Sequence, residues 1–194
     1  AHTLRVFGYK SLIYSWRLRG TFPLKLIKSP DDPWPGLINR GQDLLAGQFH
    51  WGPYQATGKT PPFHDSQAPE DYRAFLHSFA WLRDLAEVGK EAKKETGVSV
   101  FAEASMRDWL DHYTQFDALA WRADIVGERI IFLTSYAPLF LSTNDLVYRS
   151  KVLNALARHA RHLYRTAARI TRGMPRIKAA TGLIYSGLLL PGSQ

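Results

Sequence analysis

The sequence predicts an all-α domain, and three observations lead to this prediction. From residue 70 onwards, apolar residues recur at steps of three and four, which is the period of one face of a helix. Runs that alternate between apolar and polar residues, as strands do, are scarce. Helical segments of similar length follow one another through short loops, a rhythm typical of antiparallel helical hairpins.

Local signals place each element. The prolines of SPDDPWPG at 29–36 exclude a regular helix, so a basic N-terminal helix and a linker are expected over 1–36. Residues 48–56 lack a helical period, and Gly52-Pro53 favours one small irregular segment or hairpin there. Residues 89–98 are polar and contain glycines, which indicates a loop. The predicted helices span 4–19, 37–46, 70–88, 99–115, 122–141, 144–171 and 175–190.

Helix ends and core positions follow from the same reasoning. Pro138 is expected to kink or end the helix over 122–141, and Thr143 or Asn144 to cap the helix over 144–171. Leu146 is assigned to the core of that helix. The final helix is apolar over much of its circumference, and we expect it to leave an exposed apolar face.

Length and composition limit the possible classes of protein. A chain of 194 residues is the size of one domain, and its 45% apolar and 22% charged residues are typical of a globular protein. The absence of cysteine excludes disulfides, thiolate nucleophiles and cysteine-ligated metal sites. No run approaches the roughly 18 uncharged apolar residues of a membrane-spanning helix.

The net charge of +8 is unevenly distributed. Residues 1–28 hold six Lys or Arg and no acid, and residues 146–194 hold nine and no acid. The middle, 29–145, holds ten basic and seventeen acidic residues. Two cationic ends favour a polyanionic partner, although they can instead pair with the acidic middle in the fold or form solvated faces.

The clearest charge pattern is a row of arginines on the predicted helix over 144–171. Arg158, Arg161, Arg165, Arg169 and Arg172 follow one another at steps of 3, 4, 4 and 3, so they share one helix face. Such a face is either solvated or the wall of an anion-binding groove, with Arg161 and Arg165 as the proposed contacts. His159 and His162 have a spacing that suits a metal, but no acid follows residue 145 to complete a site, so no metal is predicted.

Aromatic residues form the second group of candidates. His77 and Trp81 lie one turn apart in LHSFAWLRDL, and Trp121 and Arg122 begin the helix WRADIVGERIIF. Indole faces stack on sugar rings while polar neighbours bind hydroxyls, so these four residues are candidate substrate-binding residues. The alternative interpretation is that rings at helical spacing belong to the core.

Several phrases in this order carry a resemblance to a known family. They are DDPWPG, GQFHWGPY, LHSFAWLRDL, WRADIVGERIIF, ARHARHL and a Gly-Leu helix that ends in LLLPG. Together they resemble the N-terminal part of bacterial heparinase II/III-like proteins, closest to an alphaproteobacterial branch. The resemblance implies that 1–194 is one helical domain and that 37–194 form an incomplete (α/α) toroid. More chain and a C-terminal β-sandwich would follow, and the resemblance favours the periplasm or cell envelope.

Characterised members of that family are polysaccharide lyases, which cleave acidic glycosaminoglycans by β-elimination. Similar lyases carry an Asn-Asn-His run before the last helix, where this chain reads Arg172-Gly173-Met174-Pro175. The catalytic residues are therefore unknown, no activity is expected of this chain alone, and no cofactor is expected in it.

Three functions remain open from the sequence. The first is the helical N-terminal domain of a heparinase-like lyase that acts on an acidic polysaccharide. The second is a catalytically divergent protein that binds an anionic envelope glycan without cutting it. The third, a basic helical module for nucleic acid, is disfavoured because no helix-turn-helix signature is present.

Overall fold

The fold is mostly helical, as the sequence predicts. The computed structural model describes residues 9, 14, 16, 18, 20, 25–92, 95–170 and 172–191, so most of the predicted basic helix over 4–19 lies outside the described residues. The described helices are α3 (Ile38–Leu45), α4 (Glu70–Ser78), α5 (Leu82–Ala92), α6 (Glu95–Tyr113), α7 (Ala123–Ser135), α8 (Ala137–Leu141), α9 (Leu146–Thr166) and α10 (Met174–Leu189), with a 3₁₀ turn at Ala167–Arg169.

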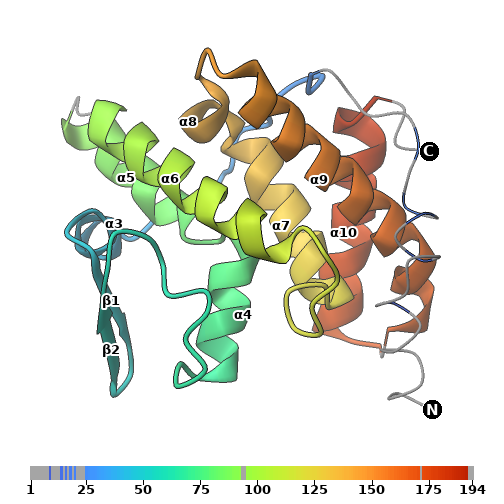
Figure 1. The fold of residues 1–194 in the computed structure, drawn as a ribbon, viewed down its shortest axis with the longest axis horizontal. Helices are drawn as coiled ribbons and strands as arrows, with labels where there is room; N and C mark the ends of the chain where they lie inside the picture. Colours follow the sequence, from blue (N-terminus) through green and yellow to red (C-terminus); the bar gives the residue numbers. More distant parts are fainter. Residues whose placement is uncertain are drawn as a thin grey trace.

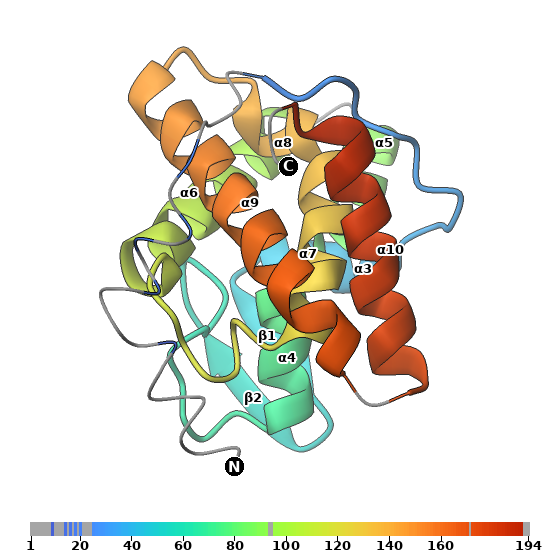
Figure 2. The same cartoon turned by 90° about the vertical axis from the view of Figure 1, so that its right-hand side faces the viewer.

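Helix α7 lies in the middle of the bundle, where it contacts α4, α8, α9 and α10 (Figure 1). Its closest neighbour is α10, because two glycines face each other across the contact. A side chain at Gly127 would meet Lys178 O at 2.4 Å, and one at Gly182 would meet Gly127 Cα at 2.5 Å. Helices α9 and α10 follow each other through a short connection and lie side by side (Figure 2).

The small hairpin predicted around Gly52-Pro53 is confirmed. Strands β1 (Gln48–Trp51) and β2 (Tyr54–Thr57) pair antiparallel, with Trp51 opposite Tyr54. Gly52 adopts a positive φ of 56° in the two-residue turn, a conformation that favours glycine. This is the one sheet formed by the described residues.

The helix predicted over 70–88 is two helices, and this prediction was wrong at its centre. α4 ends at Ser78, the next residue Phe79 adopts a left-handed φ of 61°, and α5 begins at Leu82. The Phe79 ring is buried against Trp81 and Trp109, at centroid distances of 5.3 and 5.8 Å. Tertiary packing therefore holds a backbone conformation that the helical period does not reveal.

The prediction of a loop over 89–98 is also wrong. α5 continues to Ala92 and α6 begins at Glu95, so only a short connection separates them. The segment contains no proline, and polar residues suit the solvent-facing side of a helix as well as a loop. Val98 is fully buried and anchors the start of α6 in the core.

One predicted helix interruption is confirmed and one predicted cap is corrected. The helix over 122–141 breaks at Tyr136, between α7 and α8, just before Pro138, as the prediction of a kink or end at this proline requires. Asp145, rather than Thr143 or Asn144, caps α9, because its carboxylate accepts a 3.0 Å hydrogen bond from Tyr148 N. Arg107 donates a 2.9 Å hydrogen bond to the same carboxylate group.

The burial of individual side chains shows which residues were correctly assigned to the core from the sequence. Leu153, Leu156 and Leu163 of α9 are buried, whereas Leu146 is 72% exposed and was wrongly assigned to the core, since it lies in the first turn of α9. The exposed apolar face expected of α10 is confirmed: its exposed large apolar residues are Met174, Ile177, Ile184 and Leu188.

Candidate functional site

The structure divides the arginine row of α9 into a covered part and an open part. Arg161 is 9% exposed, and its guanidinium donates a 3.1 Å hydrogen bond to Leu18 O of the N-terminal segment. Arg158 is half-buried, with its guanidinium 5.7 Å from the centre of the Trp121 ring. Arg161 was predicted to contact a ligand. In the structure it instead connects α9 to the N-terminal segment at Leu18.

The open part gathers around the end of α9 and the start of α10. Arg165 lies in the last turn of α9, Arg169 in the 3₁₀ turn, Arg172 in the connection and Arg176 in the first turn of α10. All four are exposed, and we call them the basic corner. It lies where α9 and α10 meet (Figure 2).

The basic corner has no carboxylate partners within the described part of the chain. The ion pairs found there involve other arginines, lysines or histidines, and Lys178 at the edge of the corner is paired with Glu128 at 2.9 Å. The hydrogen bond found for the Arg165 guanidinium among the described residues goes to the backbone oxygen of Arg161, at 3.5 Å. Like charges held close together without counter-charges favour an anionic partner.

The start of α10 adds to the positive potential of this corner. Gly173 occupies the N-cap position with a φ of 113°, without a side-chain hydrogen bond to the first turn. No acidic residue lies in that turn. The positive end of the helix dipole therefore lies between Arg172 and Arg176, and no carboxylate of the described residues pairs with either arginine.

The predicted tryptophans lie in the core. Trp81 and Trp121 are 0% and 2% exposed, and they belong to two different apolar clusters. Trp81 Nε1 donates to Leu76 O at 3.1 Å, and Trp121 Nε1 donates to Tyr113 O at 3.0 Å. This placement agrees with the core interpretation. Neither ring offers a face to a sugar as the side chains lie here, so their role in glycan binding stays a prediction.

His77, one of the predicted substrate-binding residues, belongs to a buried polar network around Arg129. Arg129 is fully buried, and its guanidinium donates 2.7 Å hydrogen bonds to His77 O and Ala120 O. It also lies 4.4 Å from the centre of the Trp109 ring. Burial lowers the pKa of Arg129 to about 9, so the side chain is still a cation at neutral pH.

The histidines of this network are neutral. Trp109 Nε1 donates to His77 Nδ1 at 3.2 Å, and burial followed by the Arg129 charge lowers the pKa of His77 to about 3. Burial also lowers the pKa of His162 to about 4 and that of His159 well below its usual value.

His162 uses both ring nitrogens in the protein. Its Nε2 lies 2.8 Å from Trp121 O, an acceptor, so Nε2 carries the proton and Nδ1 accepts from Tyr14 OH at 2.7 Å. His159 Nε2 lies 3.5 Å from Arg129 Nη1. A cation beside one histidine and two occupied nitrogens on the other argue against a metal at this pair.

Arg122 is engaged by carboxylates. It donates to both oxygens of Asp124, at 2.8 and 3.0 Å, and to Glu70 at 3.0 Å. The hydrogen bonds to Asp124 raise the pKa of Arg122. An acidic ligand would have to displace these partners, so Arg122 is a weaker candidate for anion binding than the basic corner.

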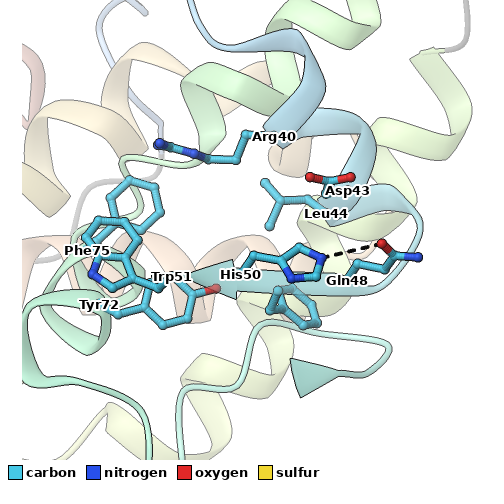
Figure 3. Close-up of a pocket in the computed structure, with 9 residues that line it drawn as sticks. Arg40, Asp43, Leu44, Gln48, His50, Trp51, Tyr72 and Phe75 are labelled. Atoms are coloured by element: carbon cyan, nitrogen blue, oxygen red, sulfur yellow. Dashed lines mark hydrogen bonds between the residues drawn. The ribbon is translucent and has the colours of Figure 1, made fainter. Parts of the chain in front are cut away.

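A cleft beside the hairpin is a feature that the sequence reasoning missed. It encloses about 180 Å³ between α3, β1 and α4, and we call it the hairpin cleft (Figure 3). Trp51 is partly exposed and stacks on Tyr72 at 5.0 Å, while the Arg40 guanidinium lies 5.3 Å from the Phe75 ring centre. Asp43 also lines it, so the cleft is of mixed charge and suits an acidic ligand less well. The aromatic and polar residues of the phrase GQFHWGPY are the sequence signal that could have indicated this region.

Among the residues that the structure places, no helix has both the length and the apolar character needed to cross a bilayer.

The fold and the site together define a helical domain with an exposed basic corner. FtsZ-localized protein C of Caulobacter vibrioides (strain NA1000 / CB15N) is 26% identical to the chain over 169 residues. The alignment covers 85% of this chain and 28% of that protein, so the chain spans little more than a quarter of its relative's length. No protein-family profile and no solved structure matches the chain.

Proposed function

We propose that this chain is the N-terminal helical domain of a longer heparinase II/III-like protein, and that its basic corner binds an acidic polysaccharide. One observation carries the binding proposal. Arg165, Arg169, Arg172 and Arg176 are exposed together, with no carboxylate partner among the described residues. Guanidinium groups bind carboxylate and sulfate through paired hydrogen bonds, and these are the acidic groups of such polysaccharides.

The position of the corner also supports the proposal. The segment Arg172–Pro175 occupies the place where the lyases that the chain resembles carry Asn-Asn-His. β-elimination requires neutralisation of the uronate carboxylate, and Arg172 with the start of α10 supplies positive charge there. An incomplete (α/α) toroid is part of this proposal, supported by the quoted motifs and by the adjacent helices α9 and α10.

Cleavage is a separate matter from binding. β-elimination also needs a base for the C5 proton, and Tyr185 is the tyrosine of the matching helix α10. Tyr185 is half-buried and packs against the apolar core. We therefore propose binding without turnover for this chain, and assign any lyase activity to the longer protein.

Calorimetric titration with a panel of polymers tests the binding proposal. We expect heparin-type and alginate-type oligosaccharides to bind and a neutral oligosaccharide of equal length to give no heat. Added salt should weaken the binding, because exposed charges are screened over about 8 Å at physiological ionic strength. Equal affinity for acidic and neutral sugars would refute the proposal. Tighter binding of a random DNA duplex than of any glycan would instead support the hypothesis that the chain binds nucleic acid.

The likeness to FtsZ-localized protein C favours a second candidate, association with FtsZ. The alignment extends over 85% of this chain, so an FtsZ contact made through that part of the relative would fall within the aligned region. Titration of the labelled chain with purified FtsZ, read by fluorescence anisotropy, tests this candidate. Saturable binding supports it, and unchanged anisotropy at high FtsZ concentration refutes it.

A further inference from the structure

Two histidines and an aspartate from distant parts of the sequence meet at the surface. Asp108 and His112 lie one turn apart on α6, and His64 reaches them from the loop that follows the hairpin. Their candidate ligand atoms all lie within 4.8 Å of one another, and we call these three residues the His64 cluster. Two imidazoles and a carboxylate are a ligand set that proteins use for zinc.

The spacing of the ligand atoms fits a single metal ion. His64 Nε2 lies 3.4 Å from Asp108 Oδ1, and His112 Nδ1 lies 3.5 Å from the same oxygen. Two ligand atoms, each about 2.0–2.1 Å from a tetrahedral zinc ion, lie roughly 3.3–3.4 Å apart. Both separations are close to this value, and the candidate ligand atoms of His64 and His112 lie within 4.8 Å of each other, so side-chain adjustments can bring all three ligands onto one zinc ion.

Neighbouring residues hold two of the three ligands in position. Tyr113 OH donates to Phe63 O at 2.8 Å, and it therefore accepts from His64 Nδ1, which lies 3.1 Å away. This bond places the His64 proton on Nδ1 and leaves the Nε2 lone pair directed at the cluster. Thr60 Oγ1 donates to Asp108 Oδ2 at 3.0 Å, which orients the carboxylate. Outer hydrogen bonds of this kind orient the ligands of metal sites.

The third ligand is less constrained. His112 Nδ1 lies 2.8 Å from Asp108 O, a backbone acceptor, so this nitrogen carries its proton when no metal is bound. Coordination through Nδ1 moves that proton to Nε2 and replaces the backbone hydrogen bond with the metal bond. The His112 side chain is 55% exposed, which leaves room for this change and for a water ligand.

We propose that the His64 cluster is a zinc site with three protein ligands and a coordination position open to water. Zinc there would fasten the loop that follows the hairpin to α6. This inference goes beyond anion binding at the basic corner, and it uses none of the same residues. Sequence spacing does not reveal the site, because His64 lies 44 residues before Asp108.

Calorimetry with zinc chloride tests the proposal on the 194-residue chain. We expect one zinc ion per chain, and each of His64→Ala, Asp108→Asn and His112→Ala should lower the affinity at least about tenfold. His50→Ala is the matched control, since His50 is also exposed and the side-chain hydrogen bond found for it among the described residues goes to Gln48, outside the His64 cluster. Its affinity for zinc should match that of the unaltered chain.

Two further measurements keep the result interpretable if a ligand variant folds poorly. Thr60→Val retains all three ligands and removes only the bond to Asp108, so it should weaken zinc binding while the circular dichroism spectrum stays unchanged. Cobalt(II) should give the intense visible absorption of a four-coordinate site, and zinc should abolish it. Zinc affinity that is unchanged in His64→Ala and His112→Ala, or more than one weak equivalent site, would overturn the proposal.

Discussion

Arg129 donates a 2.7 Å hydrogen bond from Nε to the backbone oxygen of His77, and both residues are buried. The guanidinium reaches a second backbone oxygen, that of Ala120, at the same distance. It thus connects the end of α4 to the segment before α7 without any carboxylate partner within hydrogen-bonding distance among the described residues. The two carbonyl groups and the Trp109 ring compensate for the removal of this cation from water.

Replacement of Arg129 should therefore destabilise the fold. Arg129→Met leaves two buried carbonyl groups without donors, and we expect a loss of about 2–4 kcal/mol in the free energy of unfolding. Arg129→Lys should not restore stability, because one ammonium group cannot reproduce the planar fork. Urea unfolding followed by tryptophan fluorescence measures the change. Arg176→Met, at an exposed arginine, is the control, and an equal effect of the two methionine variants would contradict this account.

The buried histidines predict a stability that falls in acid. Burial lowers the pKa values of His77 and His162 to about 3 and 4, and that of His159 also falls. Below the usual value of about 6.5 the unfolded chain takes up protons that the folded protein does not, so the free energy of unfolding decreases as pH falls from about 6.5 towards 4.

Each such histidine contributes a slope of up to about 1.4 kcal/mol per pH unit in that window. His162→Phe should reduce the slope measured by urea unfolding between pH 6.5 and 4.5. Val152→Ala, which removes buried methyl groups from α9, should lower stability equally at each pH and leave the slope unchanged. A slope that is the same in His162→Phe and the unaltered chain would disprove the assignment.

The contact between α7 and α10 predicts opposite effects for two glycines of one helix. Gly182→Ala places a methyl group 2.5 Å from Gly127 Cα, and we expect a loss of about 1–3 kcal/mol as the helices separate. Gly187 of α10 faces open space, so Gly187→Ala should stabilise the protein by about 0.5–1 kcal/mol. Thermal unfolding by circular dichroism compares them, and similar effects of both substitutions would refute the close approach.

The helical class and the hairpin follow from local patterns, which explains why the sequence predicts them. The helical spacing of apolar residues such as Tyr72, Leu76 and Leu85 correctly predicts a helix on each side of Phe79. The break itself depends on where the Phe79 ring packs, and no local pattern records that contact. The same applies to Asp145, because its carboxylate is fixed partly by Arg107 from α6.

The candidate site was predictable only in part. The spacing of the arginine row is a local property, so the sequence predicts that these arginines share a helix face. Arg165 is exposed, which an anion-binding residue must be. The hydrogen bond from Arg161 to Leu18 O connects residues 143 positions apart in the sequence. The helical pattern of α9 therefore cannot predict that Arg161 is buried. Likewise, the pattern does not distinguish a tryptophan in a groove from one in the core, and Trp81 and Trp121 lie in the core.

The most direct test of the central claim is to remove charge from the basic corner and measure the affinity for a heparin-type oligosaccharide. Arg165→Gln with Arg169→Gln should weaken binding about tenfold, whereas Lys59→Gln with Lys151→Gln, which removes equal charge from exposed sites elsewhere, should change it less than about twofold. Arg161 is left unaltered because it holds the N-terminal segment. Equal weakening by both pairs would mean that only net charge matters, and would contradict a binding site at the basic corner.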